Sequence, residues 1–179
     1  MKRILLGVCG GIAAYKAADI AHSLYKTGFS VDVIMTENAA KFITPLTFRT
    51  LTQNKVYTDM FDEHFESDVK HISLANRADL VLIAPATANF IGKLANGIGD
   101  DMLSTVMLAV RNKPVLIAPA MNTNMLENPI VKDNMEKLEQ YGYHILETKE
   151  SLLACGDYGK GALADVDTIL KEVEKYAGE

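Results

Sequence analysis

The stretch Leu82-Ile83-Ala84-Pro85-Ala86 occurs a second time in this sequence, as Leu116-Ile117-Ala118-Pro119-Ala120, 34 residues later. Each copy closes an apolar run without polar alternation, which is typical of a strand covered on both faces, as in a parallel sheet. Because proline cannot continue a central strand, each strand is predicted to end at its pentapeptide. Ligands bind beyond the carboxyl ends of such strands, so the loops after the two copies are where we expect a site.

Strands and helices are predicted to alternate along the whole chain. Further strands are expected over 4–9, 31–35 and 144–146, and helices over 12–27, 101–110, 129–142 and 166–177. Thr36, Asn89 and Asp101 are predicted to cap helices. Residues 52–70 are polar and are expected to form a surface excursion. This pattern predicts one α/β domain over 1–179, a three-layer Rossmann-like fold with a parallel sheet and helices on both faces, and a flavodoxin-like strand order is the second choice.

The composition is that of an ordinary globular protein. The net charge is -5 and 23% of the 179 residues are charged, which gives no support for non-specific nucleic-acid binding. No apolar run approaches the ~20 residues that a membrane span needs. Two cysteines, Cys9 and Cys155, do not make a disulfide framework, and without an export signal a cytoplasmic protein with reduced thiols is expected.

The first predicted turn, Gly7-Val8-Cys9-Gly10-Gly11-Ile12-Ala13, has two interpretations. It could present helix N–H groups to a phosphate, or it could be a tight connection between strand and helix. Its spacing is neither GxGxxG nor a Walker loop. The second strand ends in Thr36 rather than in an acidic residue that would bind a ribose diol, which favours a mononucleotide over a dinucleotide.

Three other side chains also keep two interpretations each. His71 is either structural or catalytic, and no cysteine or histidine spacing indicates a metal site. Cys155 lies among glycines near Lys160, in a stretch that could fold as a flap, and is either a reactive thiol or an ordinary loop residue. Asn122 either caps local backbone or donates to a ligand carboxylate.

Taken together, these motifs resemble the homo-oligomeric flavin-containing cysteine decarboxylases. The resemblance covers essentially the whole chain, and five motifs occur in the family's order. They are the phosphate turn Gly10-Gly11-Ile12-Ala13-Ala14-Tyr15-Lys16, His71, the flavin loop Pro85-Ala86-Thr87-Ala88-Asn89, the stretch Pro119-Ala120-Met121-Asn122-Thr123-Asn124-Met125-Leu126 and the substrate clamp Leu153-Ala154-Cys155-Gly156-Asp157-Tyr158-Gly159-Lys160-Gly161. Leu126 departs from the family pattern, which has tryptophan there, and Ala162 stands where many relatives carry arginine.

The resemblance implies an FMN cofactor and a role for each motif. His71, Asn122 and Cys155 would be catalytic, with His71 as acid/base, Asn122 fixing the carboxylate and Cys155 giving a proton. The residues implied to bind FMN are Gly10, Gly11, Ile12, Ala13, Thr36, Pro85, Ala86, Thr87, Ala88, Asn89 and Ala120. Those implied to bind substrate are Asn122, Met125, Leu153, Ala154 and Lys160.

The cysteine in the clamp favours the branch of the family that acts in coenzyme A biosynthesis. That branch decarboxylates 4'-phosphopantothenoyl-L-cysteine to 4'-phosphopantetheine through oxidation to a thioaldehyde, loss of CO2 and reduction of the enethiol. The resemblance also implies a stand-alone enzyme that assembles as a homo-trimer, or as a dodecamer of four trimers, with the flavin between subunits. The alternatives are a peptidyl-cysteine oxidative decarboxylase, a flavin prenyltransferase and a non-catalytic FMN-binding regulatory subunit.

Overall fold

The structure is a computed structural model that describes residues 1–61, 70–154, 156 and 158–178. A six-stranded parallel sheet crosses the molecule in the order β3-β2-β1-β4-β5-β6. Its strands are β1 (Arg3–Val8), β2 (Ser30–Met35), β3 (Val56–Tyr57), β4 (Leu80–Ala86), β5 (Val115–Pro119) and β6 (His144–Ile145). This is the Rossmann order, so the first of the two predicted topologies is confirmed.

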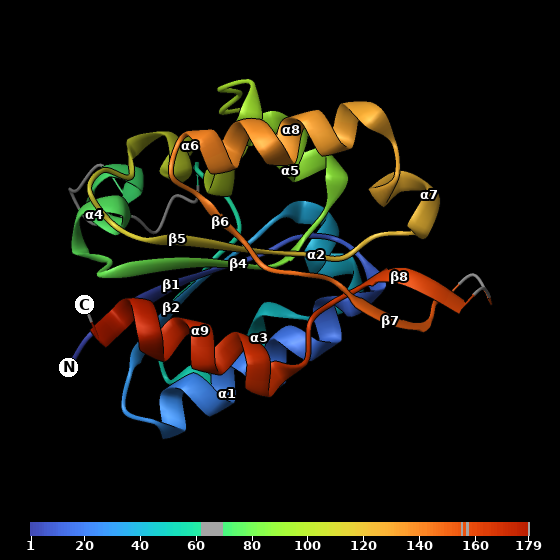
Figure 1. The fold of residues 1–179 in the computed structure, drawn as a ribbon. Helices are drawn as coiled ribbons and strands as arrows, with labels where there is room; N and C mark the ends of the chain where they lie inside the picture. Colours follow the sequence, from blue (N-terminus) through green and yellow to red (C-terminus); the bar gives the residue numbers. More distant parts are fainter. Residues whose placement is uncertain (62–69, 155, 157, 179) are drawn as a thin grey trace.

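Helices cover both faces of the sheet (Figure 1). One face carries α1 (Lys16–Lys26), α3 (Pro45–Thr52) and α9 (Val166–Gly178), and the other carries α4 (Lys70–Arg77), α5 (Ala88–Ala95), α6 (Met102–Ala109) and α8 (Pro129–Gln140). Three short helices follow the carboxyl ends of strands, namely η1 (Ile12–Tyr15), α2 (Glu37–Phe42) and α7 (Thr123–Leu126). In the described part of the chain, no helix is long and apolar enough to span a membrane.

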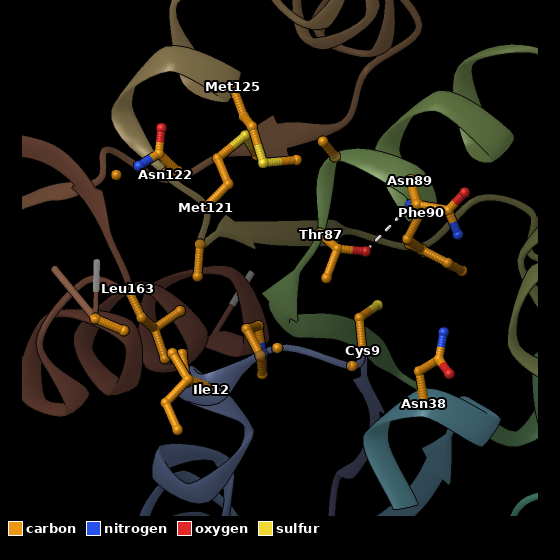
Figure 2. A pocket seen from close by; sticks show the side chains of 18 of the residues that line it. Cys9, Ile12, Asn38, Thr87, Asn89, Phe90, Met121, Asn122, Met125 and Leu163 are labelled. Atoms are coloured by element: carbon orange, nitrogen blue, oxygen red, sulfur yellow. Dashed lines mark hydrogen bonds between the residues drawn. The ribbon is translucent and has the colours of Figure 1, made fainter. Parts of the chain in front are cut away.

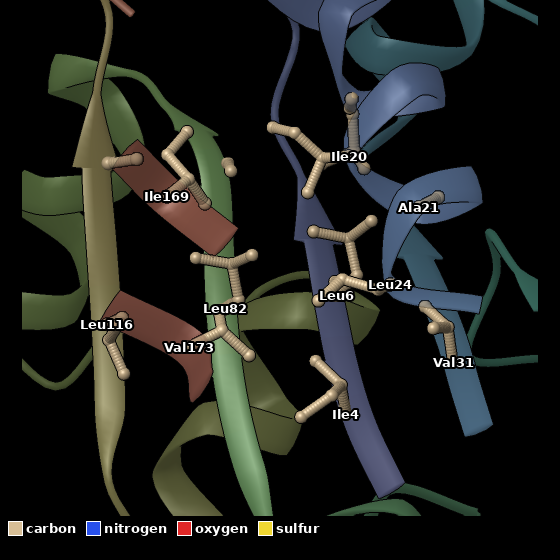
Figure 3. Close-up of a cluster of buried hydrophobic side chains, with 14 of the residues drawn as sticks. Ile4, Leu6, Ile20, Ala21, Leu24, Val31, Leu82, Leu116, Ile169 and Val173 are labelled. Carbon is tan, nitrogen blue, oxygen red and sulfur yellow. The ribbon is translucent and has the colours of Figure 1, made fainter. Parts of the chain in front are cut away.

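The repeated pentapeptides form the ends of the neighbouring strands β4 and β5. Leu82 lies opposite Leu116 and Ile83 opposite Ile117, and the register then shifts, so that Ala86 lies opposite Pro119. Leu82 and Leu116 point into the cluster beneath α1 and α9 (Figure 3), whereas Ile83 and Ile117 belong to the cluster on the opposite face. Each strand is therefore buried on both sides, as its unbroken apolar run predicts.

Helix starts largely follow the predicted caps. Thr36 accepts a hydrogen bond from the backbone N–H of Ala39 at 3.2 Å, and Asp101 forms a capping box with Ser104. The prediction for Asn89 is wrong, because Thr87 caps α5 instead and Asn89 is the second residue of that helix. Thr87 has the extended backbone that a cap needs and lies nearer to the end of the strand.

Several elements were not predicted, among them the helices α4 and α7, the strand β3 and the two strands of a hairpin. The short strand β3 extends the sheet from within the polar stretch 52–70. The glycine-rich stretch contributes to an antiparallel hairpin of β7 (Lys149–Leu152) and β8 (Tyr158–Ala162), which is separate from the main sheet.

Candidate active site

The loops that follow β1, β2, β4 and β5 meet at the carboxyl edge of the sheet. Strand order reverses between β1 and β4, which is the switch point where ligands bind in open α/β sheets. Backbone hydrogen bonds tie these strand ends together, from Cys9 N to Pro85 O at 3.1 Å and from Ala120 N to Ala86 O at 3.0 Å. These hydrogen bonds fix the strand ends relative to one another, and the loop side chains extend from them.

A cavity of about 880 Å³ opens between these loops (Figure 2). Its volume lies in the range of ordinary ligand pockets. The structure brings together at this cavity most of the residues that the sequence proposes for cofactor and substrate. They are Gly10, Gly11, Ile12, Ala13, Thr36, Pro85, Thr87, Ala88, Asn89, Ala120, Asn122, Met125, Leu153 and Ala154. Ala86 is fully buried in β4 and does not line the cavity.

The double glycine of the first turn has two separate uses. A Cβ atom on Gly10 would lie 2.3 Å from Cβ of Asn38, so glycine is needed there for the close approach of α2. A Cβ atom on Gly11 would have no neighbour nearer than 3.8 Å and would occupy the rim of the cavity. The tight connection is therefore confirmed at Gly10, whereas phosphate binding in the open space in front of η1 at Gly11 stays a prediction.

Several polar groups that line the cavity were not proposed from the sequence. Asn38, on α2 two residues after Thr36, lines the cavity, as does Lys93 on α5. Lys93 is four residues after Asn89 and so lies on the same helix face, a spacing that could have indicated it.

Lys93 is held by two carboxylates that also line the cavity. Its Nζ lies 2.7 Å from Asp100 and 3.0 Å from Asp101. The hydrogen bond to Asp100 is the main reason that the pKa of Lys93 is raised, and the same bond lowers the pKa of Asp100. The pairing fixes α5 to the start of α6, and thereby steadies the wall that carries Asn89.

The second pentapeptide ends in the loop that carries Asn122. Its side-chain Oδ1 accepts a hydrogen bond from the backbone N–H of Asn124 at 2.8 Å and caps α7. This confirms the capping interpretation and turns the oxygen toward the helix. The other end of this amide, Nδ2, is a hydrogen-bond donor, the kind of group that a carboxylate accepts from.

The hairpin supplies the remaining wall through Ser151, Leu152, Leu153 and Ala154 and through 161–163. Lys160 does not line this cavity. It lies at a second, more open pocket beside β6 and α8 that carries several glutamates. Cys155 lies outside the described residues.

His71 lies on α4, half-buried, and is not among the residues that line the cavity. The structure of one chain therefore does not bring His71 to Asn122. Cys9 does line the cavity, and its burial raises the pKa of the thiol to about 12, so it stays neutral.

Comparison with known proteins gives consistent matches over the whole chain. The sequence model of the family described as Flavoprotein matches residues 1–178. The chain is 51% identical over 178 residues to the coenzyme A biosynthesis bifunctional protein CoaBC of Bacillus subtilis, which covers 99% of this chain and 44% of that protein. It is 49% identical over 175 residues to the probable phosphopantothenoylcysteine decarboxylase of Streptococcus mutans, covering 97% of this chain and 98% of that protein. The chain thus spans less than half of CoaBC but nearly all of the Streptococcus protein.

Solved structures match equally fully. A PPC decarboxylase mutant complexed with pantothenoylaminoethenethiol has a TM-score of 0.91 and 32% identity and covers 99% of both chains. The FMN-dependent cysteine decarboxylase SpaF has a TM-score of 0.86 and 32% identity, covering 100% of this chain and 98% of that one.

Proposed function

The chain belongs to the flavoprotein family, and from this premise we propose that it is an FMN-dependent decarboxylase of 4'-phosphopantothenoyl-L-cysteine that forms 4'-phosphopantetheine. The observation that carries the proposal is the single cavity into which the flavin loop and the Asn122 loop both open. The near full-length likeness to the Streptococcus mutans protein and to the PPC decarboxylase structure supports this substrate. The Bacillus subtilis relative is named for coenzyme A biosynthesis, which supports a cytoplasmic location, and the single family match over 1–178 supports one domain over 1–179.

The volume and the polar lining of the cavity support a flavin mononucleotide as the cofactor. The open cradle at Gly11 precedes η1 and α1, where unpaired N–H groups attract a phosphate. Thr87, Asn89 and Asn38 would supply polar groups to the flavin, and the small side chain of Ala120 would leave room beside it. When bound, the flavin would supply a reversible two-electron acceptor, which decarboxylation of a simple acylated cysteine otherwise lacks.

Asn122, His71 and Cys155 would then each have a separate role in the reaction. Nδ2 of Asn122 would donate to the cysteine carboxylate and hold it until CO2 leaves. His71 would take the thiol proton while the CH2–S unit loses a hydride. The enethiol left after decarboxylation would regain the two electrons, with the proton from Cys155, so the net change is loss of CO2 alone.

Because His71 lies away from the cavity of its own chain, we propose that it reaches the cavity of a neighbouring subunit in a trimer, alone or within a dodecamer. Exposed apolar side chains support an interface, with Ile12 at the cavity 59% exposed, Phe42 at the end of α2 53% and Leu46 on α3 61%. Sedimentation should give a mass of three or twelve chains. His71→Asn should keep the flavin but lose the oxidation step, and a monomeric active protein would contradict this assembly.

Flavin and product are tested on the purified protein. We expect a yellow protein that releases FMN on denaturation, and a colourless protein that takes up no FMN would overturn the proposal. Mass spectrometry after incubation with phosphopantothenoylcysteine should find the reduced, decarboxylated product. Cys155→Ser should still release CO2 but accumulate the enethiol, whereas an unchanged product would remove Cys155 from its role.

The structure allows the role of Asn122 to be separated from its cap. Asn122→Asp keeps an oxygen for the N–H of Asn124 but replaces the donor by a negative charge. Losing a hydrogen bond to a charged group should lower kcat/KM by about 10- to 150-fold. Asn124→Asp, which adds the same charge at the exposed neighbouring position, is the matched control and should change kcat/KM little.

A peptidyl-cysteine oxidative decarboxylase is the second candidate, favoured by the match to SpaF over the whole chain. This enzyme would form the enethiol from a peptide that ends in cysteine, whereas the first candidate would form a reduced product from phosphopantothenoylcysteine. A protein that binds FMN without turning over either substrate would support the regulatory alternative instead.

A further inference from the structure

The hairpin of β7 and β8 forms a wall of the cavity without belonging to the main sheet. Two strands alone are marginally stable in water. The hairpin therefore needs an attachment elsewhere, and Figure 1 shows α7 beside it at the same end of the molecule.

The attachment runs from the Asn122 loop to the backbone of β8. The backbone N–H of Met121 donates to Gly161 O at 2.9 Å, and the hydroxyl of Thr123 donates to Lys160 O at 2.7 Å. Both donors flank Asn122, one residue before it and one after it. The two hydrogen bonds therefore join the proposed carboxylate-binding residue to the strand that closes the substrate end of the cavity.

The glycines of β8 are needed for this contact. Gly161 has a φ of +118°, and a Cβ atom there would lie 2.2 Å from the carbonyl oxygen of Met121. A Cβ atom on Gly159 would lie 2.6 Å from Oγ1 of Thr123. Alternate glycines thus clear one face of β8, so that backbone and hydroxyl can meet directly.

We infer that Thr123 is a positioning residue, whose hydroxyl fixes β8 against the Asn122 loop and so holds the hairpin wall and the carboxylate donor at one spacing. This inference rests on the proposed function for the identity of the substrate. The glycine-rich stretch thereby serves to pack β8 against the Asn122 loop, a role that its composition did not indicate. Thr123 is not among the residues that line the cavity, so its role would be exerted through β8 and the Asn122 loop.

The test compares Thr123→Val, which keeps the shape and removes the donor, with Thr123→Ser, which keeps the donor. In the flavin-loaded protein, Thr123→Val should raise KM for phosphopantothenoylcysteine about fivefold, the usual worth of one hydrogen bond, with kcat changed by less than about twofold. Thr123→Ser should restore KM. Deuterium uptake over 158–163 should be about fivefold faster in Thr123→Val than in the unaltered protein.

Thr27→Val is the matched control. Its hydroxyl also donates to backbone carbonyls, of Ser23 and Leu24, but at the exposed end of α1 away from the cavity. It should leave KM and the uptake over 158–163 unchanged. Unchanged uptake in Thr123→Val overturns the inference even if the substrate is another one, whereas faster uptake without any turnover of phosphopantothenoylcysteine by the unaltered protein would count against the proposed function alone.

Discussion

A methyl group added to Gly10 and one added to Gly11 would meet very different surroundings, although the two residues are adjacent in the first turn. At Gly10 the new carbon would lie 2.3 Å from Cβ of Asn38 and 2.6 Å from its carbonyl carbon. At Gly11 its nearest neighbour would be 3.8 Å away. Gly10→Ala and Gly11→Ala therefore form a matched pair with opposite expectations.

The size of the difference follows from these distances. To restore an ordinary contact, the backbone of α2 would have to move by about 1 Å in Gly10→Ala, and overpacking of this kind costs about 1–3 kcal/mol. Both variants gain the same small stabilisation from a less flexible unfolded chain, about 0.4–1 kcal/mol. Gly10→Ala should thus be less stable than Gly11→Ala by about 1–3 kcal/mol, or by about 2–12 °C in melting temperature for a chain of this size.

Urea denaturation of both variants, each stripped of flavin and then loaded with it, measures the difference. Without flavin only the packing at Gly10 contributes. With flavin, Gly11→Ala should lose part of the stabilisation by the ligand, because its new methyl group stands in the cradle. Equal stability of the two flavin-free variants, within about 0.5 kcal/mol, would refute the assignment of Gly10 to packing.

Two further predictions concern buried groups. Burial raises the pKa of Cys9 from 9.0 to about 12, so between these pH values the unfolded chain releases a proton that the folded chain keeps. Stability should therefore fall by up to about 4 kcal/mol as pH rises through this window, and Cys9→Ala should lose that slope in denaturation series. Asp32 is 3% exposed and forms two salt bridges, one with Arg3 and one with Arg77. In each, a carboxylate oxygen of Asp32 lies 3.0 Å from a guanidinium nitrogen. Asp32→Ala should cost about 1–3 kcal/mol in a thermal melt, since the arginines are partly hydrated, and an unchanged melt would contradict this pairing.

Most strands of the main sheet and several helix starts could be predicted because their causes are local. An unbroken apolar run identifies β4 and β5, and Thr36 and Asp101 cap helices through atoms within three residues. The short strand β3 was missed because its two residues give no periodicity and gain their place only by pairing with β2.

The site was predictable where a motif is continuous in sequence, as in the loop that ends in Asn122. It was not predictable where separate elements meet. Lys93 pairs with Asp100 and Asp101 across the break between two helices, and Gly161 is required by the carbonyl of Met121 forty residues earlier. Such requirements exist only once the chain has folded.

The identical ends of β4 and β5 have a consequence for folding. Because the two pentapeptides are identical, their side chains cannot specify which of the two strands takes the central place beside β1. That choice must come from what the two segments are joined to, including α5 after one and α7 after the other. Exchanging the two pentapeptides would leave the sequence unchanged. Exchanging the segments that follow them would instead favour a sheet in which the two strands change places.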